Sequence, residues 1–276
     1  MRMEFNNLDI AVIIPCYNEE TTIGKVVSDF KTELPEARIY VFDNNSSDQS
    51  AKIASQAGAI VVKEKRQGKG FVIASMFRKI EADFYIMVDG DDTYPADRVH
   101  DLLKPLIQEE ADMVVGNRLS KFTDDAFRPL HVFGNHIICS LINLVFSSRL
   151  KDPLSGFRAF NRDLVKHIPV VASGFDVETE MTLQILYRHY VIHEIEIPYR
   201  ERPRGSLSKL NTFSDGFVIL RKIFSILRAY KPLTFFGGIG LMLSFAGFIL
   251  GIGPIFEIIV ENVVYSVPNA IFAAIC

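Results

Sequence analysis

Residues 84–93 have the sequence FYIMVDGDDT, in which an apolar run leads directly into a cluster of carboxylates. A continuous apolar run of this length is typical of a buried strand in a parallel sheet. Asp89, Asp91 and Asp92 would then follow the carboxyl end of the strand, where open α/β sheets bind their ligands. Their carboxylates and the Thr93 hydroxyl are hard oxygen ligands for a divalent cation such as Mg²⁺, which often shares its coordination shell with substrate phosphates.

This spacing predicts an enzyme that handles a phosphorylated substrate. A second interpretation is that residues 91–95 form a polar turn that caps a helix beginning near Ala96. The cluster by itself does not decide between the two.

Short apolar runs alternate with helical periodicity on both sides of this stretch. The runs cover residues 10–14, 39–42, 59–62 and 112–115, and the segments between them carry apolar residues at helical spacing. Continuous apolar strands that alternate with helices predict an α/β fold with a mostly parallel sheet covered on both faces. The regular alternation ends after Arg118.

Two amphipathic segments follow. Residues 131–147 set polar side chains against a broad apolar face, which predicts either a core helix or a helix on the bilayer surface. Residues 213–230 set Arg221, Lys222 and Arg228 against Phe and Leu side chains and lead into an apolar stretch. Basic amphipathic helices beside membrane spans commonly lie in the interface, and we expect this for the second segment.

The chain of 276 residues is 49% hydrophobic, and the apolar excess lies at its end. Residues 233–256 carry no charge. As a helix they would reach about 36 Å, enough to cross a hydrocarbon core of about 30 Å. A second apolar run at 263–276 follows a short acidic link at 257–262 and would reach only about 21 Å. We expect either a second span that is incomplete within this sequence, or a segment that re-enters or lies at the interface.

Charges beside the span predict its orientation. Basic residues precede it and Glu257 and Glu261 follow it, so the large N-terminal part should be cytoplasmic and the protein single-pass or multi-pass in the cell membrane. Residues 1–9 do not resemble a signal peptide. Three scattered cysteines predict neither a zinc site nor a disulfide framework. The net charge of −3, without a basic patch, gives no reason to expect nucleic-acid binding.

Polar turns follow other expected strands as well. PCYNEE at 15–20 and DNNSSD at 43–48 suit a nucleotide, because Tyr17 could pack on the base and Asp43 could accept hydrogen bonds from base or ribose. Ser46 and Ser47 could also cap a helix. Gly68-Lys69-Gly70 permits close backbone approach and supplies a cation for phosphate, although so short a triplet is weak as a motif.

The ordered set of motifs resembles the family-two glycosyltransferases of GT-A fold, and within them the polyprenyl-phosphate group that includes dolichol-phosphate mannose and glucose synthases. The motifs are VIIPCYNEE at 12–20, the acidic turn at 43, DGD at 89–91, GNR at 116–118, DPLSGFR at 152–158 and GSLSKL at 205–210. The resemblance covers nearly the whole chain. Together with the amphipathic and apolar segments, it predicts a Rossmann-like, cytoplasmic GT-A catalytic domain over residues 1–212, in which the helix at 129–148 lies either in the core or at the interface. An interfacial helix at 213–230 and a membrane region at 231–276 would follow this domain.

The resemblance also implies roles for individual residues. Those implied to bind the nucleotide sugar are Pro15, Tyr17, Glu19, Asp43, Asp89, Gly90, Asp91, Arg118, Arg202 and Lys209. Those implied to hold Mg²⁺ or Mn²⁺ are Asp89, Asp91 and Thr93, and those implied to act in catalysis are Asp91, Asp152 and Arg118. Those implied to bind the acceptor phosphate are Arg128, Arg202 and Ser208.

Some of these residues have a second interpretation. Arg128 could equally snorkel at the membrane surface. Asp176, Glu178 and Glu180 could orient the acceptor or the sugar, or they could cap a helix and satisfy its dipole.

The chain departs from the family pattern in three places. Asn44-Asn45 stands where relatives often have Asp-Gly, Thr93 is a modest metal ligand, and the spacing from Arg202 to Lys209 differs by a residue from that of the mannose synthases. The departures leave the donor sugar and its nucleotide, UDP or GDP, unassigned.

The expected reaction transfers a sugar from a nucleotide donor to a polyprenyl phosphate, undecaprenyl or dolichyl, with inversion implied by the family. A lipid monophosphate has its second pKa near about 6 and is largely dianionic at neutral pH, so a strong general base is unnecessary. The lipid bilayer is a further expected partner, and a homo-oligomer is left open. The alternatives are an aspartate-nucleophile phosphatase and a non-catalytic, membrane-tethered nucleotide-sugar sensor.

Overall fold

The computed structural model describes residues 8–118, 129–171, 174, 177–200, 203, 217, 221, 224, 225, 227, 228 and 231–276, with side chains from Asn135 onward in the helix that begins at Pro129. The chain divides into two compact units, Met1–Ile223 and Phe224–Cys276, and each is described by itself.

The first unit is built on a seven-stranded sheet with the order β3-β2-β1-β4-β6-β5-β7. The strands are β1 (Ile10–Cys16), β2 (Arg38–Asp43), β3 (Ile60–Lys63), β4 (Phe84–Met87), β5 (Met113–Asn117), β6 (Arg158–Asn161) and β7 (Ile192–Glu196). β6 runs antiparallel between β4 and β5, and the other strand pairs are parallel. The expected α/β fold with a mostly parallel sheet is confirmed.

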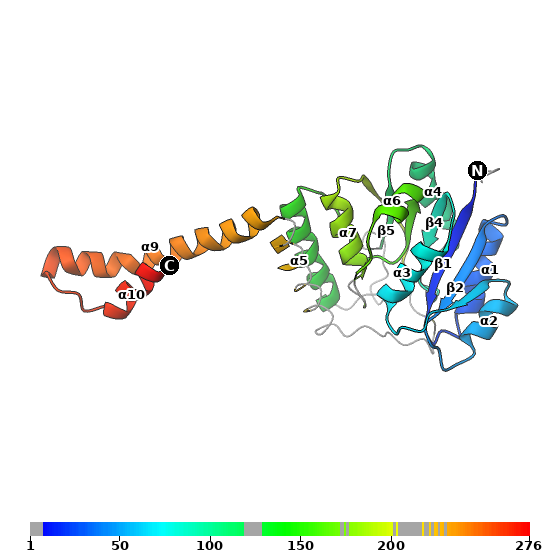
Figure 1. The fold of residues 1–276 in the computed structure, drawn as a ribbon, viewed down its shortest axis with the longest axis horizontal. Coiled ribbons are helices and arrows are strands. Elements are labelled where there is room, and N and C mark those ends of the chain that lie inside the picture. The colour runs from blue at the N-terminus through cyan, green and yellow to red at the C-terminus, as the bar shows by residue number, and fades with distance from the viewer. Residues whose placement is uncertain are drawn as a thin grey trace. The chain divides into compact units, whose positions relative to one another are not determined.

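Helices cover both faces of this sheet (Figure 1). They are α1 (Ile23–Glu33), α2 (Ser50–Gln56), α3 (Lys69–Lys79), η1 (Ala96–Arg98), α4 (Val99–Ile107), α5 (Pro129–Phe146), α6 (Arg162–His167) and α7 (Val177–Tyr187). Side chains of α1, α2 and α4 form one core cluster with alternate residues of the strands. Side chains of α3, α6 and α7 form the other cluster on the opposite face. Apolar residues that point alternately to the two faces explain why β1 is buried along its whole length.

The register brings chemically active loops to one edge. Cys16 lies beside Asp43 in the β1–β2 pair, and Ile13 lies beside Met87 in the β1–β4 pair. Because β6 is antiparallel, its first residue Arg158 lies beside Met87 and Val115, near the carboxyl ends of β4 and β5. The loop that precedes β6 therefore joins the same edge as the loops that follow β1, β2, β4 and β5.

Two helix-capping predictions are wrong. The N-cap of α2 is Gln49, without a side-chain cap, so Ser46 and Ser47 do not cap this helix. They bond instead to Asn18 in the loop after β1, while Ser50 N donates to Asp48 Oδ1 at 3.0 Å. At the start of η1 the N-cap is Pro95, which has no side-chain cap, so the aspartate cluster caps no helix there.

Helix α5 has one face buried in the first unit. Ile138, Cys139 and Ile142 are buried, whereas Leu144 on the other side is 80% exposed. The Asn143 side chain fixes the following turn, since its Nδ2 donates to Leu150 O at 2.8 Å and its Oδ1 accepts from Leu150 N at 2.9 Å. The inner face thus makes α5 a packed helix, and contact of its outer face with a bilayer stays a prediction.

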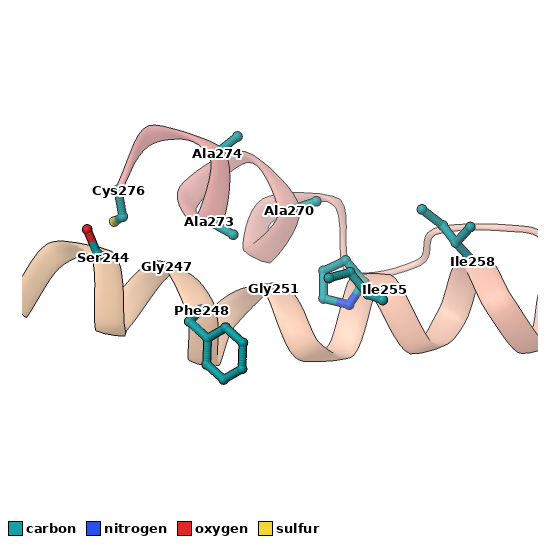
Figure 2. Close-up of a pocket in the computed structure, with 11 residues that line it drawn as sticks. Ser244, Gly247, Phe248, Gly251, Ile255, Ile258, Ala270, Ala273, Ala274 and Cys276 are labelled. Carbon is teal, nitrogen blue, oxygen red and sulfur yellow. The ribbon is translucent and has the colours of Figure 1, made fainter.

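The second unit contains α9 (Pro232–Glu261) and α10 (Val267–Ile275). By length and composition, α9 is the one helix in the described part of the chain that could cross a membrane. The predicted acidic link at 257–262 is wrong in its boundary, because α9 continues through Glu261 and ends at Asn262 in the left-handed conformation. The apolar residues that follow form a short helix that folds back along α9, over a shallow groove (Figure 2).

Within the segment 213–230, the residues that the structure describes are helical. Arg221 and Arg228 are exposed, as are Phe217 and Phe224, while Leu227 is buried. Exposed aromatic side chains beside exposed arginines are compatible with the expected amphipathic helix.

Candidate active site

The carboxylate of Asp89 meets a lysine at the carboxyl edge of the sheet. Lys69, the first residue of α3, places Nζ 2.6 Å from Asp89 Oδ1 and 2.5 Å from Glu178 Oε1 in the first turn of α7. Burial alone would lower the pKa of Lys69, but attraction to Asp89 and Glu178 raises it above its ordinary value. The result is a largely buried ionic triad whose members come from three different elements.

Asp91 is more deeply buried than Asp89, with 3% of its surface exposed. Its Oδ1 accepts hydrogen bonds from Thr93 Oγ1 at 2.6 Å and from Thr93 N at 3.3 Å. The Asp91–Thr93 pair thus forms the polar turn that one of the two interpretations predicted. The Asp91 carboxylate lies in the loop that follows β4.

Two glycines leave space for the acidic side chains. A Cβ added to Gly90 would collide with Glu19 Oε2, and a Cβ added to Gly156 would collide with Asp89 Oδ2. Gly90 is also fixed from α1, since its carbonyl accepts from Thr22 Oγ1 at 2.7 Å. Glycine at these positions lets the loops after β1, β4 and before β6 approach one another.

Arg118, directly after β5, is held by a fully buried carboxylate. Asp152 accepts from Arg118 Nε at 2.8 Å, from Nη2 at 2.9 Å and from the backbone N at 3.1 Å. The guanidinium also lies over the Tyr199 ring, 5.4 Å from its centre. Burial alone would lower the pKa of Arg118, but attraction to Asp152 raises it well above its ordinary value. A permanently charged, two-point-anchored arginine at this edge is suited to binding an anion.

The backbone that carries Asp152 is fixed by a further acid. Glu194 in β7 accepts hydrogen bonds from Lys151 N and Asp152 N, both at 2.8 Å at their shortest. Burial raises the pKa of the Glu194 carboxyl. Glu194 therefore positions Asp152, which in turn positions Arg118.

The loop at 152–157 is fixed by hydrogen bonds from Arg158, the first residue of β6. This fully buried guanidinium donates to Pro153 O at 2.6 Å and to Ser155 O at 2.8 Å, and also to Thr182 Oγ1 in α7. Tyr94 holds the same loop from the β4 side, because its Oη accepts from Gly156 N at 3.0 Å. Burial raises the pKa of the Tyr94 phenol, which keeps it neutral.

The loops after β1 and β2 are joined by hydrogen bonds. Asn18 N donates to Ser46 Oγ at 3.0 Å and Glu19 N donates to Ser50 Oγ at 2.7 Å. Tyr17, in the loop after β1, is 38% exposed, whereas Asp43 at the end of β2 is buried and its Oδ1 accepts from Ser46 N. An accessible aromatic ring and a carboxylate on these two joined loops are compatible with the expected nucleotide contacts.

Asn44, one of the departures from the family pattern, ties the second of these loops to α3. Its Nδ2 donates to Glu64 O and Arg66 O, and its Oδ1 accepts from Gly68 N at 2.8 Å. Gly68 has a φ of 134°, which favours glycine. Asparagine here thus fixes the backbone that carries Lys69.

Not every predicted site residue can be placed. The structure brings Pro15, Tyr17, Glu19, Asp43, Asp89, Gly90, Asp91, Thr93, Arg118 and Asp152 to the carboxyl edge of the sheet. The predicted residues Arg128, Asp176, Arg202, Ser208 and Lys209 lie outside the described residues. Glu180, in the first turn of α7, accepts from Val171 N at 3.1 Å.

The oxygen ligands at the end of β4 suit a hard divalent cation. Asp89 and Asp91 are separated by one residue and both offer carboxylate oxygens. The Thr93 hydroxyl, which is hydrogen-bonded to Asp91, is a further oxygen ligand. No group of three or more Asp, Glu, His or Cys side chains with metal-binding geometry occurs among the described residues. This donor set fits a Mg²⁺ or Mn²⁺ ion that takes its remaining ligands from a substrate diphosphate.

Solved structures share this fold. Glucosyl-3-phosphoglycerate synthase from Mycobacterium tuberculosis, crystallised with Mn²⁺, UDP and phosphoglyceric acid, superimposes with a TM-score of 0.64 at 22% identity over 81% of this chain and 78% of its own. Mannosyl-3-phosphoglycerate synthase from Rubrobacter xylanophilus gives 0.64 at 19% identity, over 82% and 76%. The sheet and the helices that cover it define a GT-A fold.

The chain belongs to glycosyl transferase family 2, whose model matches residues 11–169. Glycosyltransferase AglJ of Haloferax volcanii is 32% identical over 96% of this chain and 86% of its own length. A dolichyl-phosphate hexose transferase of the same organism is 30% identical over 81% and 96%. The family predicted from the motifs is confirmed. Because the chain belongs to this family, the phosphatase alternative is wrong.

Three residues that build the site were not assigned such roles from the sequence. Glu194 and Arg158 carry no pattern of their own, and Lys69 was only a weak phosphate candidate. The one available signal for Arg158 was its place at the end of the motif DPLSGFR. For Lys69, the signal was the pair of flanking glycines.

Proposed function

We propose that this chain is a metal-dependent, inverting hexosyltransferase that moves a sugar from a UDP- or GDP-linked donor to a polyprenyl phosphate. One observation carries the proposal: the acidic pair Asp89 and Asp91 and the anchored cation Arg118 meet at one edge of the sheet. Two anions that must be brought together, a diphosphate and a lipid phosphate, need both a metal and fixed positive charge between them.

On the donor side, Tyr17 packs on the base and Asp43 accepts hydrogen bonds from base or ribose. The exposure of Tyr17 and the hydrogen-bonded loops around it support this assignment. Pro15, Glu19 and Gly90 are assigned to the same nucleotide-binding site.

Asp89, Asp91 and Thr93 would hold Mg²⁺ or Mn²⁺. When bound there, the ion supplies charge stabilisation for the departing nucleoside diphosphate. Arg118, with Arg202 and Lys209, neutralises phosphate charge at the same centre. Asp152 acts in catalysis by keeping Arg118 in one orientation.

On the acceptor side, Arg128, Arg202 and Ser208 hold the lipid phosphate. No protein base needs to remove a proton, because the lipid monophosphate is already largely dianionic at neutral pH. Catalysis then rests on placing the phosphate oxygen opposite the bond between the sugar and the diphosphate.

The attachment to the membrane supports a lipid acceptor. The apolar helix α9 has the length and composition of a membrane span. Relatives named dolichyl-phosphate hexose transferase and dolichol-phosphate mannosyltransferase support the same acceptor class. We place residues 1–212 at the cytoplasmic face, followed by an interfacial helix at 213–230 and the membrane region at 231–276.

The reaction can be tested by nucleotide release. Purified protein is mixed with a panel of UDP and GDP sugars and with undecaprenyl or dolichyl phosphate, in Mg²⁺ or Mn²⁺. We expect one donor to release nucleotide only when a lipid phosphate is present. Binding of donor without release under all conditions would favour the sensor and contradict a transferase.

A further inference from the structure

Lys69 bonds two carboxylates that come from different elements. Its Nζ lies 2.6 Å from Asp89 Oδ1, after β4, and 2.5 Å from Glu178 Oε1, in α7. The side chains of Lys69 and Glu178 are only 12% and 6% exposed. The ammonium is therefore enclosed with its partners and is not a mobile surface charge.

The backbone at Lys69 is fixed as well as its ammonium group. Gly68 N donates to the buried Asn44, and the helix that Lys69 begins places Val72, Ile73 and Met76 in the core. Lys69 is thus held both at its backbone and at its ammonium group.

This arrangement has an electrostatic consequence for any cation that approaches Asp89. Two like charges about 4 Å apart repel each other even in water, and more strongly at a partly buried site. A divalent ion on Asp89 would lie close to the Lys69 ammonium, which already bonds one oxygen of that carboxylate. A nucleotide diphosphate brings enough negative charge to offset both cations.

We propose that Lys69 is a resident countercation of the metal site, which keeps the affinity for a free divalent ion low and makes tight metal binding depend on the nucleotide diphosphate. This inference rests on the metal assignment of the proposed function. Lys69 acts as a positioning residue for Asp89 and, once the diphosphate is bound, as part of its charge balance.

The test measures Mn²⁺ binding to the full chain in detergent, by calorimetry or electron paramagnetic resonance. Lys69→Met removes the charge, Lys69→Gln removes it but keeps a hydrogen-bond donor for Asp89, and Lys69→Arg retains it. Lys52→Met, on the exposed side of α2, is the matched control. If the Met variant does not fold, the Gln variant still tests the loss of charge. Thermal unfolding shows whether each variant is folded.

With Mn²⁺ alone, we expect Lys69→Met and Lys69→Gln to bind about tenfold more tightly than the parent, since one repelling charge is removed. Lys69→Arg and Lys52→Met should bind as the parent does. Saturating UDP or GDP should raise the Mn²⁺ affinity of the parent. In the two neutral variants, the nucleotide should raise it by a smaller factor.

Asp91→Asn distinguishes failure of the Lys69 proposal from failure of the metal assignment. If it abolishes Mn²⁺ binding while the folded neutral variants bind Mn²⁺ no more tightly than the parent, the countercation role is overturned and the metal site stands. If Asp91→Asn leaves Mn²⁺ binding unchanged, the metal assignment fails, and the inference about Lys69 fails with it.

Discussion

At the residue scale, the two cations Lys69 and Arg118 at the sheet edge are each paired with acidic side chains from elsewhere in the chain. Lys69 is balanced by Asp89 and Glu178, and Arg118 is balanced by Asp152. Such pairing is required because an isolated buried charge is costly. Asp89 and Asp91 could be found from the sequence, since they follow an apolar run at a predictable edge. The pairing of Lys69 with Glu178 could not, because it depends on where α7 packs.

Substitution of Asp91 tests the metal assignment. We predict that Asp91→Asn abolishes transfer with little change in melting temperature, because the amide oxygen can still accept the bonds from Thr93 while the charge is lost. Transfer is measured at limiting Mg²⁺ or Mn²⁺, and thermal unfolding is followed in detergent.

Asp92→Asn is the matched control. Asp92 is the adjacent acid, it pairs with Lys25, and its φ of 58° is one that asparagine adopts readily. The control should retain most activity. Full activity of Asp91→Asn would refute the assignment.

At the element scale, the strands β1 to β5 followed from apolar runs and helical spacing, whereas β6 and β7 did not. β6 is a short antiparallel strand inserted between β4 and β5, and its order in the sheet is set by packing rather than by periodicity. The insertion matters for the site, because it brings the loop with Asp152 to the edge where Arg118 follows β5. Tertiary contacts thus decided what local pattern could not.

The loop between β3 and α3 should respond to acid through Glu64. Hydrogen bonds from Arg66 lower the pKa of the buried Glu64 from 4.5 to about 2. A depressed folded-state pKa stabilises the protein above about pH 4.5, and this contribution is lost as pH falls towards 2.

We therefore expect the parent to melt above Glu64→Gln at pH 7, with the difference shrinking by pH 3. Glu81→Gln, which removes an exposed partner of Lys166, should give a smaller difference at pH 7. Equal melting curves of the parent and Glu64→Gln at both pH values would contradict this role of Glu64.

The pairing of α9 with α10 depends on a small side chain at Gly247. A Cβ there would lie 2.9 Å from Cys276 Cβ and 3.1 Å from Ala273 O, whereas a Cβ at Gly240 meets nothing within 4 Å. Figure 2 shows Ser244 facing Cys276 across the two helices. We predict that Ser244→Cys forms an intrachain disulfide with Cys276 on oxidation. Leucine at Gly247 should block this bond, and leucine at Gly240 should not.

The disulfide is detected by mass spectrometry of the digested chain. Cys16 and Cys139 are buried and should not compete. Efficient crosslinking in the presence of Gly247→Leu would mean that the contact does not hold α10 in place.

At the scale of the whole molecule, the chain combines a glycosyltransferase unit with α9, a candidate membrane span, and the direction of such a span decides on which side of the membrane the reaction takes place. The basic residues before α9 and the acidic residues Glu257 and Glu261 near its end favour a cytoplasmic catalytic unit. We predict that protease added to intact cells spares residues 1–230. Cleavage within this part, in cells whose membranes are shown to be sealed, would reverse the orientation.

The most direct test of the central claim is to identify the lipid product. The purified full chain, a nucleotide sugar chosen from the panel and polyprenyl phosphate are incubated with Mg²⁺ or Mn²⁺, and the lipid fraction is analysed by mass spectrometry. The account predicts a polyprenyl phosphate that has gained one hexose, formed by the parent and absent with Asp91→Asn. Free sugar and nucleotide without a glycosylated lipid would contradict the account.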